Sequence, residues 1–253
     1  MSDELISCIL ATRNRPQFVE QALRCFEAQT YRNRELIVVD DGELNVRELC
    51  LNRRHVRYIG LPQPTTTGMK LNIGIASASG NVLQKYDDDD YYHPKFLETA
   101  AAHLPTRGRD RAIVAWDCFL ALQVGNPSIR FSGHGWKVGG TLSFSRALWE
   151  RCPFRNVPRS VDSLFLSDHK ESARVIPVCA PQYYVVVRHG ANTWKYFSDG
   201  RTVEQYFNAL EVYPKPIEKI VARRDREFYL ALVKPVKPTA VSVLRPAASK
   251  RSR

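Results

Sequence analysis

The sequence predicts an α/β protein in which helices cover both faces of a mostly parallel central sheet. Short, almost wholly apolar runs such as LISCILA (residues 5–11) and ELIVV (35–39) are typical of strands buried on both faces. Segments with apolar residues at helical spacing alternate with these runs, and polar residues follow each run directly. A chain of 253 residues is long enough for one such domain with a sizeable core.

The first part of the chain supplies the clearest elements. Pro16 and Pro94 each stand where a helix is expected to begin, a position that tolerates proline. Gly80 and Asn81 are typical of the end of a helix before the next strand. We expect strands at residues 5–11, 35–39, 56–59 and 82–86, and helices from Pro16, over 68–78 and from Pro94.

Beyond residue 110 the pattern is looser. We expect strands at residues 112–116, 119–124, 139–144 and 183–187, and helices from Arg146, over 203–213 and over 217–232. Gly139 and Gly140 open one of these strands, where they serve either a turn or a close approach of the backbone to a ligand.

The net charge of +11 is concentrated at the C-terminal end of the sequence. Residues 231–253 contain six Lys or Arg and no acid, and three prolines there disfavour a packed helix or strand. We therefore expect residues 233–253 to form a basic, disordered tail. This tail could contact an anionic membrane surface, and we expect no specific nucleic-acid partner.

Cysteine usage and hydropathy indicate the compartment. The six cysteines are scattered without a C-x-x-C pair, which favours reduced thiols over disulfides. The acidic residues near the N-terminus are unlike a signal peptide, and no apolar stretch approaches the roughly 20 residues that span a bilayer. The sequence predicts a cytoplasmic protein, which the tail could hold at the inner face of the membrane.

Four consecutive carboxylates, Asp87 to Asp90, directly follow the predicted strand at residues 82–86. Two carboxylates about 4 Å apart near a protein surface repel each other by roughly 4 kcal/mol before screening by water and salt. Mg²⁺ or Mn²⁺ bound together with a diphosphate would offset this repulsion. The simpler reading is a solvated acidic loop, but ligands of α/β sheets bind at the carboxyl ends of strands, where this run lies.

A second acidic pair, Asp40 and Asp41, ends the predicted strand at residues 35–39 and precedes Gly42. A carboxylate at this place can accept hydrogen bonds from ribose hydroxyls or from a base imide N–H. The same three residues are equally typical of a turn that serves backbone geometry alone. The spacing leaves both interpretations open.

These motifs together resemble a known family. The string ISCILATRNRPQFVEQALRCFEAQTYRNRELIVVDDG, followed by KLNIGIASASGNVLQKYDDDDYYHPKFL, is similar to the nucleotide-binding half of the family 2 glycosyltransferases, which have the GT-A fold. The resemblance is specific over residues 5–97 and weaker to about Trp194. It implies a nucleotide-sugar-binding half at residues 1–110 and an acceptor-binding, catalytic half of the same domain at 111–232.

The resemblance also implies roles for individual residues. The family's D-x-D motif corresponds best to residues 87–89, with Asp89 as the principal metal ligand. His189 corresponds to a late histidine at the metal or diphosphate, and imidazole suits Mn²⁺ better than Mg²⁺, although a lone histidine is more often structural. Lys70 stands where the family often has arginine. The residues assigned to the nucleotide or donor sugar are Thr12, Asn14, Asp40, Asp41, Lys70, Asp87 and Asp88.

Asp162 is the candidate catalytic base. It lies in SVDSLFL, which resembles the family's acidic catalytic motif at the start of a helix, although Val161 replaces the first acid. A carboxylate there could instead serve only the helix dipole. Asp168 is a second candidate for the base.

The implied activity is inverting, metal-dependent transfer of a sugar from a UDP-linked or similar donor to a hydroxyl of a carbohydrate or lipid-linked acceptor. The expected cofactor is Mn²⁺ or Mg²⁺. One alternative is a sugar-phosphate nucleotidyltransferase, but no glycine-rich phosphate loop follows the first strand. Another is a non-enzymatic basic module that binds RNA or membrane.

Overall fold

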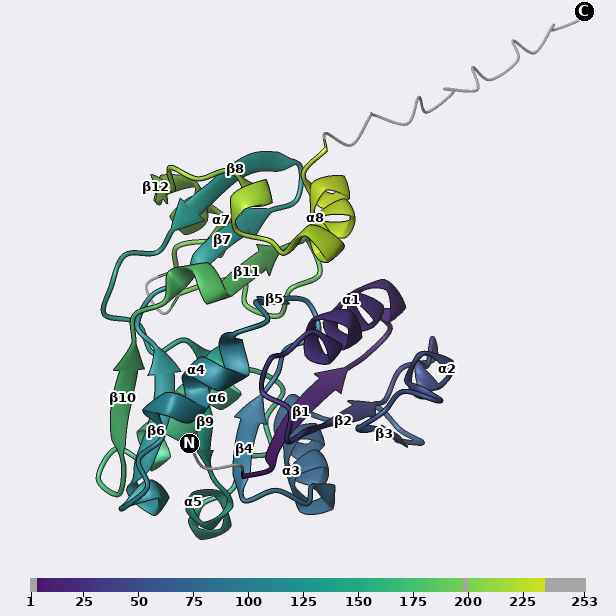
Figure 1. The fold of residues 1–253 in the computed structure, drawn as a ribbon, viewed down its shortest axis with the longest axis vertical. Coiled ribbons are helices and arrows are strands. Elements are labelled where there is room, and N and C mark those ends of the chain that lie inside the picture. The colour runs from purple at the N-terminus through teal and green to yellow at the C-terminus, as the bar shows by residue number, and fades with distance from the viewer. Residues whose placement is uncertain (1–3, 198–199, 235–253) are drawn as a thin grey trace, which may run out of the picture.

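The computed structural model describes residues 4–197 and 200–234, which form two β-sheets with helices packed around them (Figure 1). The first sheet has seven strands in the order β10 (Arg174–Val178), β6 (Ala112–Trp116), β9 (Ser143–Ser145), β4 (Val82–Lys85), β1 (Ile6–Thr12), β2 (Arg34–Asp40) and β3 (Val56–Gly60). Strand β1 pairs in parallel with β2 and β4, β2 with β3, and β6 with β10, whereas β9 runs antiparallel to β4 and β6. The predicted mostly parallel α/β sheet is confirmed.

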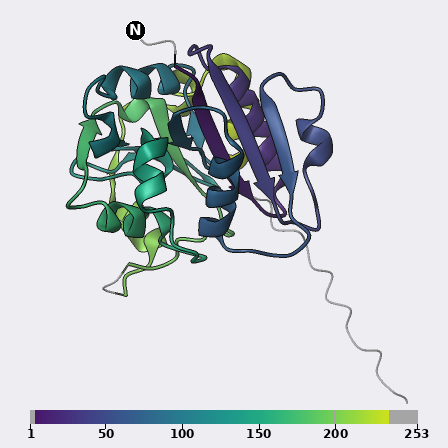
Figure 2. The same cartoon turned by 90° about the horizontal axis from the view of Figure 1, so that it is seen from below.

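Successive residues of the central strands bury their side chains on opposite faces of this sheet. On β1, Leu10 packs in the core that includes Phe18 of α1 (Pro16–Glu27), and Ile9 packs in the core that includes Leu71 of α3 (Thr67–Ser77). Both faces are therefore covered by helices, as Figure 2 shows. Helices α2 (Arg47–Cys50) and α4 (Phe96–His103) lie on the α1 side, and α5 (Arg146–Arg151) and α6 (Val161–Asp168) on the α3 side.

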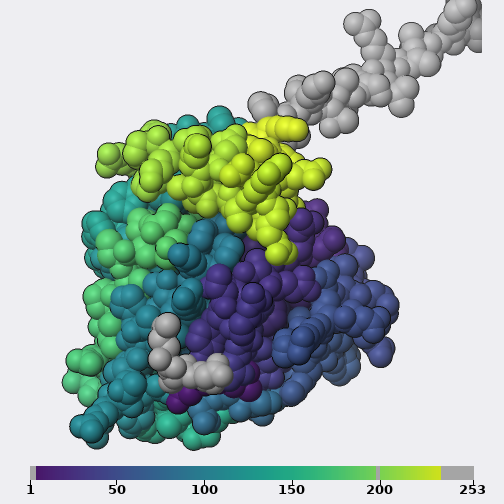
Figure 3. All heavy atoms as spheres, in the orientation of Figure 1, coloured from purple at the N-terminus to yellow at the C-terminus, as the bar shows by residue number. Residues whose placement is uncertain are grey.

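The second sheet lies beside the first and has five strands in the order β12 (Glu211–Val212), β8 (Asn126–Phe131), β7 (Leu120–Gln123), β11 (Tyr184–Arg188) and β5 (Tyr91–Tyr92). Helices α7 (Val203–Ala209) and α8 (Arg226–Val233) cover it. Figure 3 shows the segment with α8 in yellow against α1 in purple, where Gln21 Nε2 donates to Asp225 Oδ1 at 3.0 Å. The C-terminal part of the described chain thus closes over the N-terminal helix.

Two predicted helices were wrong in extent. The helix expected at 203–213 ends at Ala209, because residues 211–212 pair with β8 and the Leu210 carbonyl accepts from Arg130 Nη1 at 2.9 Å. The helix expected at 217–232 is two short 3₁₀ turns, Ile217–Lys219 and Arg223–Asp225, followed by α8. Ala222 between the turns is extended, and its N–H donates to Tyr91 at 2.9 Å. Tertiary contacts override helical periodicity at both places.

One predicted strand was wrong in extent, and other strands were not predicted. Residues 139–141 form a 3₁₀ turn, and only Ser143–Ser145 pairs as a strand. Strands β8 and β10 were missed because each contains a proline, Pro127 and Pro177, which weakens a strand pattern. Strand β10 tolerates its proline because it is the edge of the first sheet.

The described helices, the tail and the expected boundary near residue 110 bear on the remaining predictions. Within residues 4–197 and 200–234, the longest helix is too short and too polar to cross a bilayer. The expected disordered tail lies outside the described residues from position 235 onward. The proposed boundary near residue 110 does not divide the first sheet, since β6, β9 and β10 join strands from the first half.

Helix α3 packs so closely on the sheet that Gly74 leaves no room for a side chain. A Cβ atom at residue 74 would lie 2.5 Å from Ile9 Cγ2 and 3.1 Å from Val39 Cγ2. We predict that Gly74→Ala lowers the free energy of unfolding by about 1–3 kcal/mol, because this clash outweighs the roughly 1 kcal/mol gained from helix propensity.

Denaturant unfolding would measure this effect. Gly190→Ala is the matched control, since a Cβ atom there meets nothing within 4 Å. A Gly74→Ala protein as stable as the control would contradict the close packing.

Candidate active site

The acidic run lies between the two sheets, since it follows β4 of the first and precedes β5 of the second. It sits beside the carboxyl end of β1, where the side chain of Thr12 reaches it. Asp88 and Asp90 are buried and the other two members are partly so. Each of the four carboxylates has different partners.

Asp88 faces β1. Its Oδ2 accepts a hydrogen bond from Thr12 Oγ1 at 2.6 Å, and its Oδ1 lies 2.9 Å from Arg15 Nη1. Burial and the neighbouring charge of Asp89 raise the pKa of Asp88 to about 6, although Arg15 and Thr12 oppose the rise. Ionisation of Asp88 therefore lowers the free energy of unfolding.

Asp89 is the point at which distant segments meet. Its Oδ2 accepts from Arg15 Nη1 at 2.9 Å, from His189 Nε2 at 2.9 Å and from Asn192 Nδ2 at 3.1 Å. Burial alone would raise the pKa of Asp89, but the hydrogen bond from His189 and the charge of Arg15 outweigh it and hold the pKa below its usual value. The structure thus brings together the two residues predicted to bind metal, Asp89 and His189.

The ring of His189 is fixed from both sides. It stacks on Phe18 of α1 with the ring centroids 4.4 Å apart, and its backbone N–H donates to Asn192 Oδ1 at 2.6 Å. Because the ring is packed and its Nε2 points at Asp89, His189 can hold a ligand at one defined place.

Arg15 was missed by the sequence analysis. Its Nη1 lies 2.9 Å from both Asp88 Oδ1 and Asp89 Oδ2, and its Nη2 donates to the Ala191 carbonyl at 2.6 Å. A guanidinium charge therefore sits between two neighbouring carboxylates. The sequence did contain a signal for Arg15. It is a cation in the loop after β1, and the acidic run follows β4, the parallel neighbour of β1.

Asp90 bonds to β11 rather than to a cation and serves the fold. It accepts hydrogen bonds from the Tyr184 hydroxyl and from the Val187 N–H, the latter at 2.9 Å, so it anchors β11. Burial, followed by the charges of Asp89 and Asp87, holds its pKa well above the usual value.

Lys85, also missed by the sequence analysis, connects Asp87 with Asp162. Its Nζ lies 2.5 Å from Asp87 Oδ1 and 3.4 Å from Asp162 Oδ1. Burial works against the lysine charge, but Asp162 and Asp87 outweigh it and raise the pKa of Lys85. The sequence contained a signal for this role, since Lys85 lies in a buried strand directly before the acidic run. A buried cation requires anionic partners.

The predicted base, Asp162, lies in the first turn of α6 against the 3₁₀ turn at residues 139–141. A Cβ atom on Gly139 would collide with the carboxylate of Asp162, and one on Gly140 would lie 2.7 Å from Asp87 Oδ2. Both glycines therefore permit a close approach, here to protein carboxylates. Asp162 Oδ1 accepts no hydrogen bond within the described part of the chain.

Asp41 and Lys70 form a buried pair behind Thr12. Lys70 Nζ donates to Asp41 Oδ1 at 2.7 Å and to the Thr12 carbonyl at 2.8 Å. Asp41 Oδ2 accepts from the Thr65 N–H at 2.7 Å, and its side chain has no exposed surface. Both oxygens of the Asp41 carboxylate are therefore engaged within the protein.

Asp40, the last residue of β2, and Asn14, in the loop after β1, both accept hydrogen bonds from the loop after β2. The two oxygens of Asp40 accept from the N–H groups of Gly42 and Val46, each at 2.9 Å. Asn14 is exposed, has a φ of 54°, and accepts from the Leu44 N–H at 2.9 Å. Both side chains are engaged in shaping the loop after β2.

Asp168, the second candidate base, lies at the last turn of α6. It forms a bidentate ion pair with Arg155, with Oδ2 2.8 Å from Arg155 Nε. It is therefore not brought to the acidic run, whereas Asp162 is.

The donor set at Asp89 fits a divalent cation. A carboxylate and an imidazole converge there, with Asp88 adjacent, and a guanidinium charge already bridges the two carboxylates. Carboxylate oxygen and imidazole nitrogen suit Mn²⁺, and carboxylate oxygen suits Mg²⁺. Such an ion would compete with Arg15 for the same oxygens.

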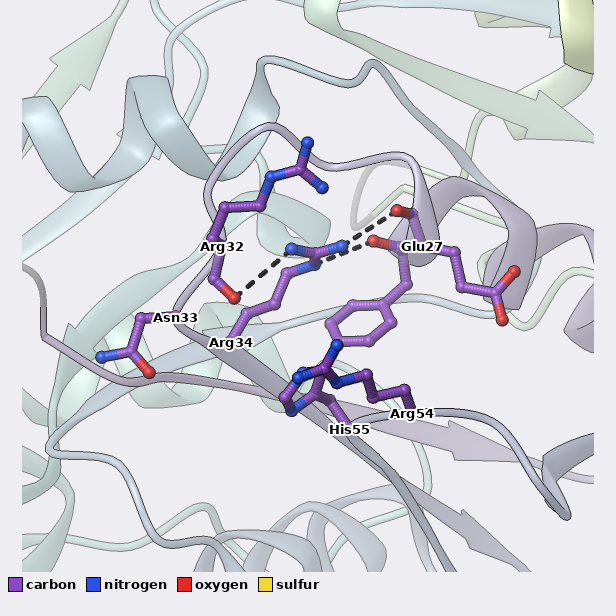
Figure 4. A pocket seen from close by; sticks show the side chains of 7 residues that line it. Glu27, Arg32, Asn33, Arg34, Arg54 and His55 are labelled. Carbon is purple, nitrogen blue, oxygen red and sulfur yellow. Dashed lines mark hydrogen bonds between the residues drawn. The ribbon is translucent and has the colours of Figure 1, made fainter.

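A cavity of about 670 Å³ lies at the other end of β2, away from the acidic run (Figure 4). Arg34 points its guanidinium at backbone carbonyls there, including those of Phe26 at 3.0 Å and Glu27 at 2.9 Å. Arg34 thus holds the last turn of α1 in place. None of the residues that line the cavity belongs to the acidic pair at 40–41 or to the acidic run at 87–90. The residues that line it are Phe26, Glu27, Arg32, Asn33, Arg34, Arg54 and His55.

Comparison with known proteins gives a consistent result. A family model described as Glycosyl transferase family 2 matches residues 7–144. An uncharacterized glycosyltransferase of Haemophilus influenzae is 27% identical over 105 residues, covering 40% of this chain and 32% of that protein. Glycosyltransferase GlyG of Streptococcus pneumoniae is 28% identical over 115 residues, covering 44% and 38%. The alignments span about a third of the length of these curated relatives.

Solved structures share the fold. TarS 1–349 of S. aureus in complex with UDP-GlcNAc has a TM-score of 0.59 at 17% identity, covering 74% of this chain and 59% of that chain. Mannosyltransferase PcManGT from Pyrobaculum calidifontis, in complex with GDP-Man and Mn²⁺, has a TM-score of 0.57 at 18% identity, covering 72% and 56%. At these identities the likeness establishes the fold alone.

The raised pKa of Asp88 predicts a pH-dependent stability. Since the native state keeps the Asp88 proton to about pH 6 and the unfolded state loses it near pH 4, stability should fall as the pH rises through that window. We predict a loss on the order of 1–3 kcal/mol in metal-free wild type relative to Asp88→Asn, which cannot ionise.

Urea unfolding in the presence of a chelator, repeated at pH values between 3.5 and 7 in steps of roughly half a pH unit, would measure this difference. Parallel profiles for wild type and Asp88→Asn would show that Asp88 ionises normally.

Proposed function

The chain belongs to glycosyl transferase family 2, and from that premise we propose that it is a glycosyltransferase that uses a divalent metal and a UDP-linked sugar. The sugar passes to an acceptor hydroxyl with inversion. The observation that supports this proposal best is the convergence of Asp89, His189 and Asp162 on one edge of the first sheet from segments far apart in the sequence.

The nucleoside would lie over the ends of β1 and β2. Thr12, Asp41 and Lys70 form one hydrogen-bonded unit at these strand ends, the position where open α/β sheets bind ligands. Asp88 is joined to the same unit through Thr12. The UDP-GlcNAc complex of TarS and the GDP-Man complex of PcManGT are consistent with nucleotide-sugar binding on this fold. We assign Asn14 and Asp40 the supporting role of shaping the nucleotide loop.

The diphosphate would lie at Asp89 and His189. These two residues would hold the metal ion, which neutralises charge on the departing nucleoside diphosphate. Arg15 lies beside them and supplies a second, permanently charged group that can turn to the phosphates when the ion takes its place between the carboxylates. The loops after β1 and β11 thus close on the diphosphate together.

Asp162 would remove the proton from the acceptor hydroxyl as its oxygen attacks the anomeric carbon. Its side chain is 28% exposed, so an acceptor can reach it, and Lys85 holds it near Asp87 on the donor side. We place the acceptor over α6 and the turn at residues 139–141, and the donor sugar at Asp87 and Asp88. The half of the chain from residue 111 then supplies the acceptor side.

Family membership favours glycosyl transfer over nucleotidyl transfer and over a purely binding role. We propose a carbohydrate or lipid-linked acceptor and a peripheral contact of the basic tail with anionic lipid. The charge of residues 231–253 supports the second proposal, since the stretch has six cations and no acid.

The first prediction concerns the metal ligand. Calorimetry against a panel of nucleotide sugars should find a donor whose binding strengthens with Mn²⁺ and is lost with a chelator. We predict that Asp89→Asn weakens the metal-dependent binding by about tenfold or more.

Asp110→Asn is the control, because Asp110 pairs with Arg151 away from the acidic run and 48% of its side chain is accessible. The proposal fails if no donor binds, or if Asp89→Asn binds donor with the wild-type metal dependence.

The second prediction separates the base from binding. With water in place of the acceptor, slow hydrolysis of the donor should fall by about 10²–10⁴-fold in Asp162→Asn, whereas donor affinity should stay close to that of wild type.

Asp168→Asn is a matched control on the same helix, because its carboxylate pairs with Arg155 away from the site. Equal hydrolysis rates in the two variants would remove Asp162 from the role of base.

A further inference from the structure

A second group of metal-binding side chains lies apart from the acidic run. It consists of Asp117, Cys118, His134 and Cys179, and one ligand atom from each lies within 4.8 Å of the others. His134 Nδ1 is 3.1 Å from Asp117 Oδ2 and 4.0 Å from Cys179 Sγ. We name these four residues the Cys-His cluster.

The fold brings the Cys-His cluster together from three segments. Asp117 and Cys118 directly follow β6, Cys179 directly follows β10, and β6 and β10 are parallel neighbours whose last residues are in register. His134 comes from the loop after β8. The cluster has no C-x-x-C spacing, so only the paired strand ends and the returning loop reveal it.

The ligand types differ from those of the acidic run. Two thiolates, an imidazole and a carboxylate are soft or borderline donors that suit Zn²⁺ in a tetrahedral site, whereas the acidic run offers mainly hard oxygens. Zinc bonds of about 2.0–2.3 Å place ligand atoms roughly 3.3–3.8 Å apart, so small rotations of exposed side chains would suffice. His134 and Cys179 are both exposed and Cys118 is buried, which leaves a route of entry from one side.

One carboxylate oxygen of the Cys-His cluster accepts no hydrogen bond within the described residues. Asp117 Oδ2 pairs with His134, but Asp117 Oδ1 is buried and accepts no hydrogen bond within the described part of the chain. A buried carboxylate oxygen without a donor is costly, and a cation at the cluster would offset that cost. The hydrogen bond between His134 and Asp117 Oδ2 does not account for this oxygen.

We propose that the Cys-His cluster binds one Zn²⁺ and thereby fixes the loop that leads to the acceptor side. The loop after His134 is already tied to the cluster, since the Trp136 N–H donates to the Asp117 carbonyl at 2.8 Å. Five residues after His134, Gly139 packs on the carboxylate of Asp162. A zinc ion would therefore anchor the start of a segment whose end contacts the proposed base.

Zinc binding to the full chain tests the proposal without any assay of transfer. All proteins would carry Asp89→Asn, so that the acidic run contributes little, and would be reduced and stripped of metal. Titration with Zn²⁺ against a chromophoric chelator should give one equivalent per chain. Co²⁺ in place of zinc should show the thiolate-to-metal charge-transfer band and the intense visible bands of tetrahedral coordination.

Two variants at exposed cluster positions identify the ligands. Cys179→Ser and His134→Ala should each weaken zinc binding by about tenfold or more, and Cys179→Ser should lower the charge-transfer band. Cys152→Ser is the matched control, because Cys152 is a partly buried free thiol outside the cluster, and it should bind zinc as the parent does.

Three outcomes would overturn the proposal. One is a parent protein that takes up no stoichiometric zinc, and another is equal zinc affinity in Cys179→Ser and Cys152→Ser. The third is a protein whose Cys118 and Cys179 thiols, exposed to air with zinc present, pass two electrons to dissolved O₂ and form a disulfide, which would make the pair a redox couple.

Discussion

The structure depends on one electrostatic constraint: four adjacent carboxylates must be accommodated without their mutual repulsion destabilising the folded state. The chain satisfies it by giving each carboxylate different partners. Lys85 pairs with Asp87, Arg15 bridges Asp88 and Asp89, and hydrogen bonds from β11 hold Asp90. The partners differ in kind as well, so the run contains carboxyls with lowered and raised pKa values.

This separation of partners also assembles the molecule. The groups that compensate the run come from the loop after β1, from β4 itself and from β11 and its following loop, so the two sheets meet where the charges are balanced. The same residues therefore contribute to the stability of the fold and to the geometry of the site. A metal ion that displaces Arg15 would replace one positive charge beside the carboxylates with another, and the contact between the two sheets would stay in place.

The sequence predicted the first half of the fold well because local rules decide it. The predicted strands at 5–11 and 35–39 have the apolar composition typical of a doubly covered sheet, and the acidic pair and run follow strand ends. Arg15 escaped prediction because its partner Asp88 is 73 residues away and is brought near by the pairing of β1 with β4. Lys85 escaped prediction because its second partner, Asp162, comes from α6 in the other half of the chain. The helices expected at 203–213 and 217–232 were wrong because backbone bonds to Arg130 and Tyr91 interrupt their helical pattern.

The central claim is that Asp89 and His189 hold a divalent cation together with the donor diphosphate. Crystals grown with UDP and Mn²⁺, measured on both sides of the manganese absorption edge, would locate that ion by its anomalous signal. We expect a peak within coordination distance of the Asp89 carboxylate and the His189 ring, with Arg15 turned away from the two carboxylates. A UDP-bound structure with no peak there, and with Arg15 still between Asp88 and Asp89, would contradict it.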